Sequence, residues 1–308
     1  MTSRRPLDRA WARLRLTALL AVAALLAACA HAPQNASDAA GIGQDNPLAG
    51  CCETPERSPG WLVALVEPAA PLVGNVIGRI AWRGGHLAGD DKALRLLGER
   101  MRPLDIIVVS SKGRLSGNTL PGLFVHAITY LGTKAELRRL GVWDHPAVRP
   151  HQAAIRAGAV FVEADYRGVH LSRPEAVLNT DRLVLLRPNR TGKGGRAGEA
   201  VRLAGHVGGP FDFNFDGDDP DRLFCTELVG HVMPQLTLSS RQAYGRRIIL
   251  ADEMIADALA GRNGLRVVLY LKGDRQGVLM PGRAALARDV GAAWNGQRPT
   301  GRRCAFGR

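Results

Sequence analysis

The strongest constraint on the fold is a set of short strand-like runs spread over the middle of the chain. These runs are rich in apolar, β-branched and aromatic residues, which is typical of strands. They are residues 105–110, 122–131, 159–166, 182–187 and 264–271. The links between them are of hairpin length or contain helical patterns, without a regular strand–helix–strand rhythm. This arrangement favours an α+β fold over a doubly wound parallel sheet.

Helical patterns precede and separate these runs. The expected helices are residues 91–101, 133–141, 150–157 and 198–205. The second has a clear start, because Thr133 and Glu136 have the spacing of a capping box. Residues 102–275 therefore predict one domain of ordinary size for a single hydrophobic core.

The N-terminus predicts an export signal. Residues 1–15 contain five Arg, and residues 16–28 form a Leu/Ala-rich stretch that is too short for an ordinary membrane span. The stretch ends in Leu-Ala-Ala-Cys29, which resembles a bacterial lipobox, where the chain is cut before a cysteine that is then diacylated. We expect residues 1–28 to be a lipoprotein signal peptide and Cys29 to carry lipid. A plain signal peptide with a chance cysteine, or a short anchor, is the alternative.

Two segments lie between this signal and the domain. Residues 29–60 are rich in Ala, Gly, Asn, Asp and Pro, and predict a flexible tether. Residues 61–101 predict a helical segment. Its first part, residues 61–82, is apolar but is interrupted by Glu67 and two prolines. We expect two short helical pieces there, which pack on the domain or lie at a bilayer surface.

The net charge of +13 is concentrated at the two ends of the chain. Residues 1–28 hold five Arg and one Asp, and residues 274–308 hold seven Arg and two Asp. The body of the chain therefore has only a small excess of positive charge and no dense basic run, which argues against nucleic-acid binding. Residues 276–308 read as a basic tail that is solvated, or that touches anionic lipid or cell-wall polymer.

The chain contains five cysteines: Cys29, Cys51, Cys52, Cys225 and Cys304. In an exported protein the four that are not acylated would lie in an oxidising compartment. Cys51 or Cys52 could pair with Cys304, since adjacent cysteines rarely bond to each other. Cys225 lies alone in the best-patterned region, which suits a free thiol.

The stretch FDFNFDGDDPDRLFCTELVGHV, residues 211–232, has two interpretations. Asp212, Asn214 and Asp216 followed by a glycine look like the start of a calcium loop. A calcium loop needs a bidentate Glu at its twelfth position, which is Leu223 here, while Glu227 comes four residues late. We therefore expect no metal and no cofactor.

The second half of that stretch predicts a helix with a cysteine at its start. Phe224, Leu228 and Val232 share one helical face, and Cys225 lies in the first turn. A helix N-terminus has partial positive charge and unpaired N–H groups, which favour a thiolate and can receive an oxyanion.

A nucleophilic thiol also needs a base. In the run 122–131, His126 is a polar group on an otherwise apolar face; alone, such a histidine is more often a satisfied core residue. In the run 159–166, Glu163 lies between Val162 and Ala164 and needs a partner. A histidine N–H could be the partner of this carboxylate. The alternative is that Glu163 forms a salt bridge with an Arg.

These residues also carry a family resemblance over about residues 102–232. The matching runs are PLDIIVV, LPGLFVHAITYLG, VEA, GPFDF and FCTELV. In order and setting they resemble the circularly permuted papain-like hydrolases of the YiiX/YebB/YaeF type, relatives of the NlpC cell-wall peptidases. In the permuted group the histidine strand precedes the cysteine helix, as it does here.

The resemblance implies an antiparallel barrel-like sheet packed against the cysteine-bearing helix. It also assigns Cys225 as nucleophile, His126 as base and Glu163 as the group that orients His126, with Asp212 shaping the turn before the helix. Two departures are visible: the interval between His126 and Glu163 is long, because a helical insertion is expected at 133–158, and Phe211 stands where a tyrosine is common.

The sequence thus predicts a thiol hydrolase that forms an acyl-enzyme. We expect it to be lipid-anchored in a bacterial cell envelope, on the outer membrane facing the periplasm, and to cleave amide or peptide bonds in cell-wall peptides. The alternatives are a lipid amide or ester hydrolase or acyltransferase, and an inactive binding lipoprotein. An apolar path to Cys225 would favour a lipid, and an open polar groove would favour a peptide.

Overall fold

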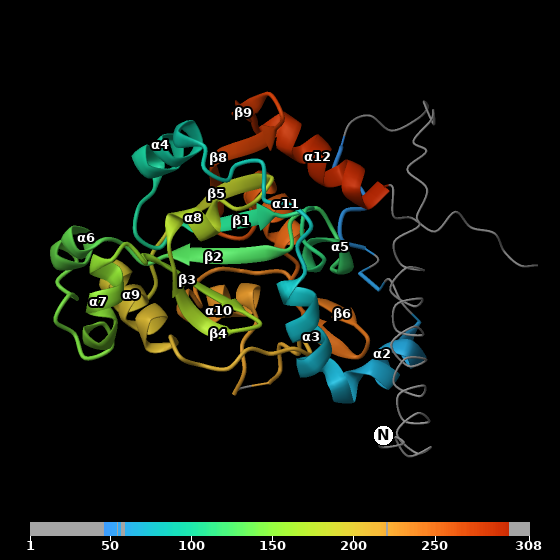
Figure 1. The fold of residues 1–308 in the computed structure, drawn as a ribbon, viewed down its shortest axis with the longest axis horizontal. Coiled ribbons are helices and arrows are strands. Elements are labelled where there is room, and N and C mark those ends of the chain that lie inside the picture. The colour runs from blue at the N-terminus through green and yellow to red at the C-terminus, as the bar shows by residue number, and fades with distance from the viewer. Residues whose placement is uncertain (1–45, 54, 57–58, 220, 296–308) are drawn as a thin grey trace, which may run out of the picture. The chain divides into compact units, whose positions relative to one another are not determined.

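A seven-stranded antiparallel sheet organises the chain, in the order β4-β3-β2-β1-β5-β8-β9 (Figure 1). The computed structural model describes residues 46–53, 55–56, 59–219 and 221–295. The strands of the sheet are β1 (Ile106–Ser110), β2 (His126–Tyr130), β3 (Phe161–Asp165), β4 (Gly168–Ser172), β5 (Arg182–Pro188), β8 (Leu265–Asp274) and β9 (Gly277–Leu279). A separate pair consists of β6 (Arg241–Ala243) and β7 (Arg246–Ile248). The fold is therefore mixed α/β, with an antiparallel sheet as expected.

The sheet is open, so the expected barrel-like closure is wrong. Its two edges are β4 and β9, and the other five strands lie between them. The centre is β1, whose five residues are all buried, flanked by β2 and β5. Closing the sheet would require the edges to pair, and β9 has only three residues for this.

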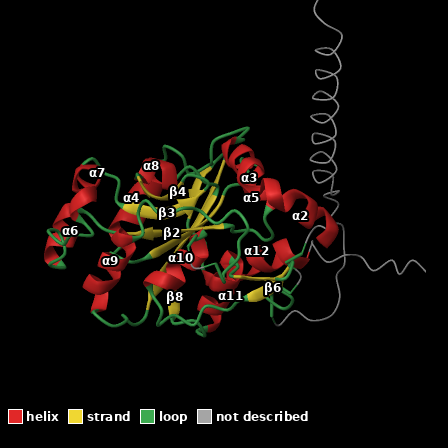
Figure 2. Cartoon of the chain, turned by 90° about the horizontal axis from the view of Figure 1, so that it is seen from below, coloured by secondary structure: helices red, strands yellow, loops and turns green. Residues whose placement is uncertain are grey.

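Helices cover the sheet and its ends. They are α2 (Gly60–Val66), α3 (Ala70–Arg79), α4 (Asp91–Arg100), α5 (Ser116–Thr119), α6 (Lys134–Arg139), α7 (Gln152–Arg156), α8 (Pro174–Val177), α9 (Gly195–Gly205), α10 (Cys225–Val232), α11 (Ala251–Ala260) and α12 (Arg283–Asn295). Short 3-10 turns occur at η1 (Glu67–Ala69) and η2 (Arg149–His151). Helices α9, α10 and α11 lie together on one side of the sheet (Figure 2), where α10 contacts β2 and β3.

The predicted strands and helices are present, with shifted ends. The capping box at Thr133 and Glu136 is formed as expected. The strand expected from residue 122 begins only at His126, because the N–H groups of Leu123 and Phe124 donate instead to the Asp252 carboxylate. We expected β8 to be the last strand. It is followed, after a tight turn, by β9, which pairs with it.

The tail expected over residues 276–308 is folded as far as Asn295. Helix α12 buries Leu286, Val290 and Trp294 against the body. The Trp294 indole N–H also donates to Asp252, 2.7 Å away, which fixes the helix to α11. The basic residues suggested a solvated tail because composition does not show that the apolar residues between them are buried.

The tether expected over residues 29–60 is likewise partly folded. Cys52 is buried, and the Pro47 carbonyl lies so close to Gly291 of α12 that a side chain there would collide with it. The structure joins Cys51 to Cys52, although bonds between adjacent cysteines were expected to be rare. The backbone of Cys52 is left-handed, with φ of 70°. Cys304, the expected partner, lies outside the described residues.

Residues 60–82 form the two helical pieces that the sequence predicts. Helix α3 packs closely on the body, since an added Cβ at Gly74 would lie 2.4 Å from the Phe213 ring, and one at Gly78 2.3 Å from the Tyr166 ring. Glu67, between the helices, forms an ion pair with Arg246. By length and composition alone, the stretch Gly60–Arg79 is long and apolar enough to cross a membrane.

Candidate active site

Strand register brings three titratable side chains together on one face of the sheet. Glu163 of β3 pairs with Ile128 of β2 on one side and with His170 of β4 on the other. His126 lies two residues before Ile128, so it is the diagonal neighbour of Glu163. The helical insertion between β2 and β3 leaves this pairing intact, because both strands enter the sheet side by side.

His126 and Glu163 form a close pair, with Nε2 of the imidazole 2.7 Å from Oε2 of the carboxylate. Burial opposes a charge on His126, but the charge of Cys225 and hydrogen bonds to Cys225 and Glu163 outweigh it and raise the pKa of His126 well above its usual value. Burial likewise opposes ionisation of Glu163, yet hydrogen bonds from His126, His170 and Ser172 hold its pKa well below the usual range. The favoured state is an imidazolium beside a carboxylate.

Two further groups hold the Glu163 carboxylate in place. The Ser172 hydroxyl donates to Oε1, and His170 Nε2 lies 3.4 Å from the same oxygen. Burial works against a charge on His170, but its contacts with Glu163 and Gly168 raise its pKa. Sequence reasoning missed both residues, because the run 168–172 was not identified as a strand; its position after the Arg167-Gly168 turn was the available signal.

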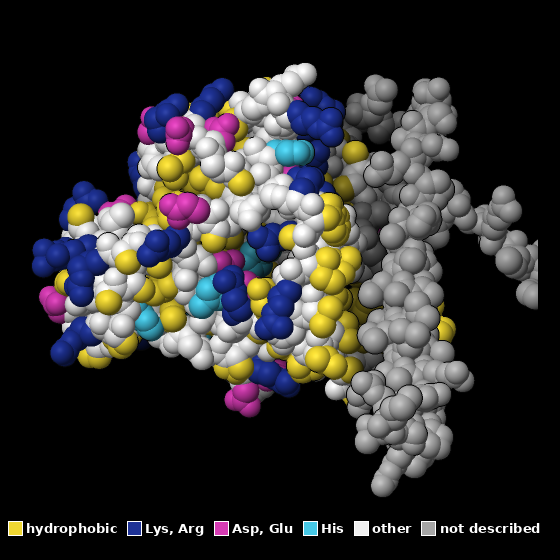
Figure 3. All heavy atoms as spheres, viewed as in Figure 1, with side chains coloured by type: hydrophobic (Ala, Val, Ile, Leu, Met, Phe, Trp, Pro, Cys, Tyr) yellow, Lys and Arg dark blue, Asp and Glu magenta, His cyan; other side chains and the backbone are white. Residues whose placement is uncertain are grey.

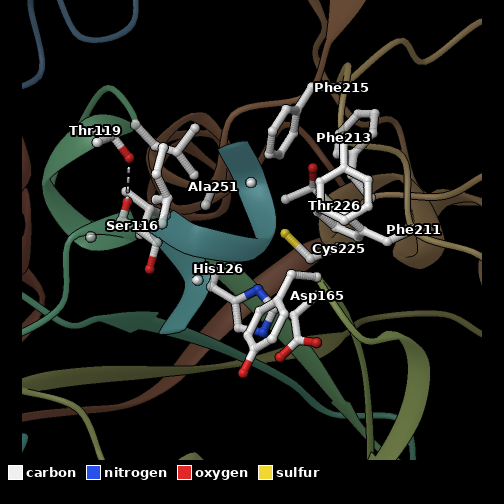
Figure 4. Close-up of a pocket in the computed structure, with 18 of the residues that line it drawn as sticks. Ser116, Thr119, His126, Asp165, Phe211, Phe213, Phe215, Cys225, Thr226 and Ala251 are labelled. Atoms are coloured by element: carbon white, nitrogen blue, oxygen red, sulfur yellow. Dashed lines mark hydrogen bonds between the residues drawn. The ribbon is translucent and has the colours of Figure 1, made fainter. Parts of the chain in front are cut away.

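Cys225 is the first residue of α10, as predicted, and its thiol is free and buried. Helix α10 begins after Phe224, whose extended backbone ends the preceding loop. The first hydrogen bond of the helix runs from the Leu228 N–H to the Phe224 carbonyl. The N–H groups before Leu228, in the first turn, therefore have no partner within the helix. Figure 4 shows the Cys225 side chain next to the His126 ring.

The loop before α10 is shaped by Asp212, as the resemblance implied. Its buried carboxylate accepts N–H groups of Asn214 and Asp216, which closes a tight turn. Phe211 pairs with Leu223 across the base of the loop. The loop thus delivers aromatic side chains and the cysteine helix to the same place.

A cavity of about 620 Å³ opens onto Cys225, His126 and Glu163. Most of its lining is apolar, and it is supplied by α2, α3, α5 and the 211–215 loop. In Figure 4 the rings of Phe211, Phe213 and Phe215 gather on the side of Cys225 away from His126. The cavity is of the size that holds small organic ligands.

Glu163, Asp165 and His170 also approach closely enough to share a metal ion. Each already has a charge partner: Glu163 contacts His126, Asp165 binds the Arg167 guanidinium at 2.7 Å, and His170 contacts both carboxylates. These contacts hold the Glu163 carboxylate in place.

The structure therefore places Cys225, His126 and Glu163, expected from the sequence, around one cavity. Cys29, the expected lipidation site, lies outside the described residues. Comparison of the chain with family models, curated proteins and solved structures found no match.

Proposed function

We propose that the protein is a thiol hydrolase that removes an acyl group from an amide or ester through an acyl-enzyme on Cys225. The observation that carries the proposal is the shared cavity, in which a free cysteine at a helix N-terminus faces a histidine paired with a buried carboxylate. A nucleophile, a base and an orienting group within reach of one another are the parts that covalent acyl transfer requires.

The proposed reaction has two steps. The Cys225 thiolate attacks the acyl carbonyl carbon, a C–S bond forms, and the C–N or C–O bond breaks as the His126 imidazolium gives its proton to the leaving group. Water then attacks the thioester while His126 takes its proton, the C–S bond breaks, and a carboxylic acid is released as the Cys225 thiolate and the His126 imidazolium are restored. The free N–H groups at the start of α10 are suited to hold the oxyanion in both steps.

The lining of the cavity favours an apolar acyl group. Val73 and Ile77 of α3 and the phenylalanines of the 211–215 loop leave an apolar path to the sulfur. A long acyl chain could lie there without leaving a polar group unpaired, whereas a cell-wall peptide would bury charged groups against apolar walls. The lipid amide or ester, an alternative from the sequence, is therefore our first choice of substrate class.

A cell-wall peptide amide remains a second candidate. Asn179 and the ion pair of Asp165 with Arg167 line the same cavity and are polar groups that a polar substrate could contact. Sacculi digested by the protein would then release peptide fragments, while acyl amides and esters would stay intact.

The direct test is to trap the acyl-enzyme. The full-length chain is mixed with nitrophenyl esters of short and long acyl chains and with an N-acyl amide, quenched in acid and weighed intact. We expect a mass increase equal to the acyl group, located on Cys225 and absent in Cys225→Ser. An adduct on another residue, or none with any ester or amide, contradicts the proposal.

A further inference from the structure

The α2–α3 segment has apolar side chains on its outer face as well as on its inner face. Leu62, Val66 and Val73 line the cavity. On the outside, the exposed fractions are 68% for Trp61, 71% for Leu65 and 70% for Leu72, with Val76 and Trp82 also exposed. A surface helix in water normally turns a polar face outward.

The few polar groups of this segment do not supply such a face. Glu67 is neutralised by Arg246 of β7, and the Asn75 amide donates to the Pro71 carbonyl of its own helix. The outer surface is therefore an apolar strip, which Figure 3 shows as hydrophobic side chains running over α3. An exposed strip of this kind, at the entrance of a cavity, marks a contact surface.

We propose that the outer face of α2 and α3 docks onto the surface of an anionic phospholipid bilayer and feeds the cavity from it. Docking itself does not require catalysis, but the delivery of an acyl lipid to Cys225 rests on the proposed function. The bilayer is chosen over other occupants on three grounds.

The first ground is the kind of residue at the edges. Trp61 and Trp82 lie at the two ends of the strip, and Trp is the side chain that suits the boundary between headgroups and acyl chains. Arg79 is exposed at its C-terminal end, where a guanidinium group can meet phosphates; Figure 3 shows basic side chains beside the apolar ones.

The second ground is the position of the chain before the segment. Cys29, expected to be lipidated, precedes the first described residue, Asn46, by 17 positions. Even fully extended, that length spans at most about 60 Å. An anchored chain would therefore keep the domain within that reach of the membrane, which raises the effective concentration of α2 and α3 at the surface.

The third ground is continuity. The same two helices have apolar side chains in the cavity that contains Cys225 and apolar side chains in solvent, so the cavity lining and the outer strip belong to one segment. The ion pair of Glu67 and the close packing of Gly74 and Gly78 hold the segment on the body, which fits a helix pair lying flat at the interface.

The proposal is tested by hydrogen exchange on the full-length chain with and without vesicles. The probe is phosphatidylethanolamine vesicles with about one quarter phosphatidylglycerol, against vesicles of neutral phosphatidylcholine. We expect peptides covering residues 60–82 to gain protection with the anionic vesicles and less with the neutral ones. Because the readout is local, membrane binding through an anchor elsewhere in the chain does not by itself protect these residues.

A matched pair of variants separates this face from general hydrophobicity. Leu65→Glu with Leu72→Glu places two charges on the strip; Leu94→Glu with Leu279→Glu places the same charges on exposed leucines elsewhere. The first pair should abolish the added protection and lower turnover of a vesicle-embedded long-chain ester by about tenfold or more. Turnover of a soluble short-chain ester should not change. The second pair should behave as the wild type.

Other occupants give different results, each of which overturns the proposal. Protection of residues 60–82 without vesicles, together with a dimer mass, identifies a second copy as the partner. The same protection in a monomer identifies another segment of the chain. No protection under any condition leaves the face without a partner.

The two proposals can fail separately. If residues 60–82 gain protection with vesicles but no ester or amide acylates Cys225, the docking stands and the hydrolase is wrong. If Cys225 is acylated by soluble esters but residues 60–82 never gain protection, the hydrolase stands and the docking is wrong.

Discussion

His126 Nε2 lies 2.7 Å from Glu163 Oε2, although the two residues are 37 positions apart in the chain and lie on different strands. The carboxylate is almost fully buried and is held on its other side by Ser172 and His170. A carboxylate fixed in this way fixes the imidazole in turn, which leaves the other ring nitrogen for Cys225. The predictions below follow from this arrangement and from the packing that supports it.

Glu163→Gln should reduce kcat/KM by about 100-fold, because the amide neither stabilises the imidazolium nor selects its tautomer. The pKa of His126, which Glu163 helps to raise, should fall, as measured by NMR titration of the ring protons. Glu175→Gln, a matched change on the exposed side of α8, should leave both quantities unchanged. An unaltered His126 titration in Glu163→Gln would contradict the orienting role.

His170→Gln should have a smaller effect, about two- to tenfold in kcat/KM, since His170 acts only through Glu163. Removal of its imidazole should raise the pKa of Glu163, and with it the acid limb of the pH–rate profile should move to higher pH. A merely structural role would lower stability without moving the profile. The two are separated by measuring the profile and the melting temperature together.

Asp252 predicts a pH-dependent stability. Burial raises its pKa from 3.8 to about 6, although it accepts hydrogen bonds from Leu123, Phe124 and Trp294. The stability that the protonated Asp252 contributes to the folded state is therefore fully present below about pH 4 and is lost as the pH rises through about 6. Relative to Asp252→Asn, the wild type should lose about 3 kcal/mol of unfolding free energy over this range. A difference between the two proteins that is constant with pH would exclude this assignment.

Gly78→Ala should loosen the wall of the cavity. The added methyl group would lie 2.3 Å from the Tyr166 ring, so either α3 or that ring must shift, at a cost of about 1–3 kcal/mol in unfolding free energy. Turnover of long-chain esters should fall more than that of short-chain esters. Gly98→Ala in α4, where nothing lies within 4 Å, should instead stabilise the protein by about 0.5–1 kcal/mol. Equal effects of the two changes would contradict the close packing of α3.

The sequence predicted the parts of the site that depend on local pattern. Cys225 at the start of a helix follows from apolar spacing over residues 224–232, and His126 and Glu163 follow from alternation within two strands. Their meeting could not be derived from alternation, because it depends on the register of β2 against β3. The family resemblance supplied that step.

Other features depend on contacts between distant residues and escaped sequence reasoning. His170 reaches Glu163 only because β4 pairs with β3, and α12 is held by Trp294 and Asp252, which are 42 residues apart. The openness of the sheet depends on how its edge strands end. Periodicity carries no information on such contacts.

The central claim is that Cys225 and His126 act as a nucleophile and its base, and thiol alkylation tests it most directly. An ordinary cysteine, with a pKa of about 8.5, reacts slowly near pH 6. We expect iodoacetamide to label Cys225 rapidly at that pH in the folded full-length chain, His126→Ala to slow this labelling by about tenfold or more, and His145→Ala, an exposed control, to leave it unchanged. Slow labelling of Cys225 that is indifferent to His126 would contradict the account and leave a binding lipoprotein as the remaining interpretation.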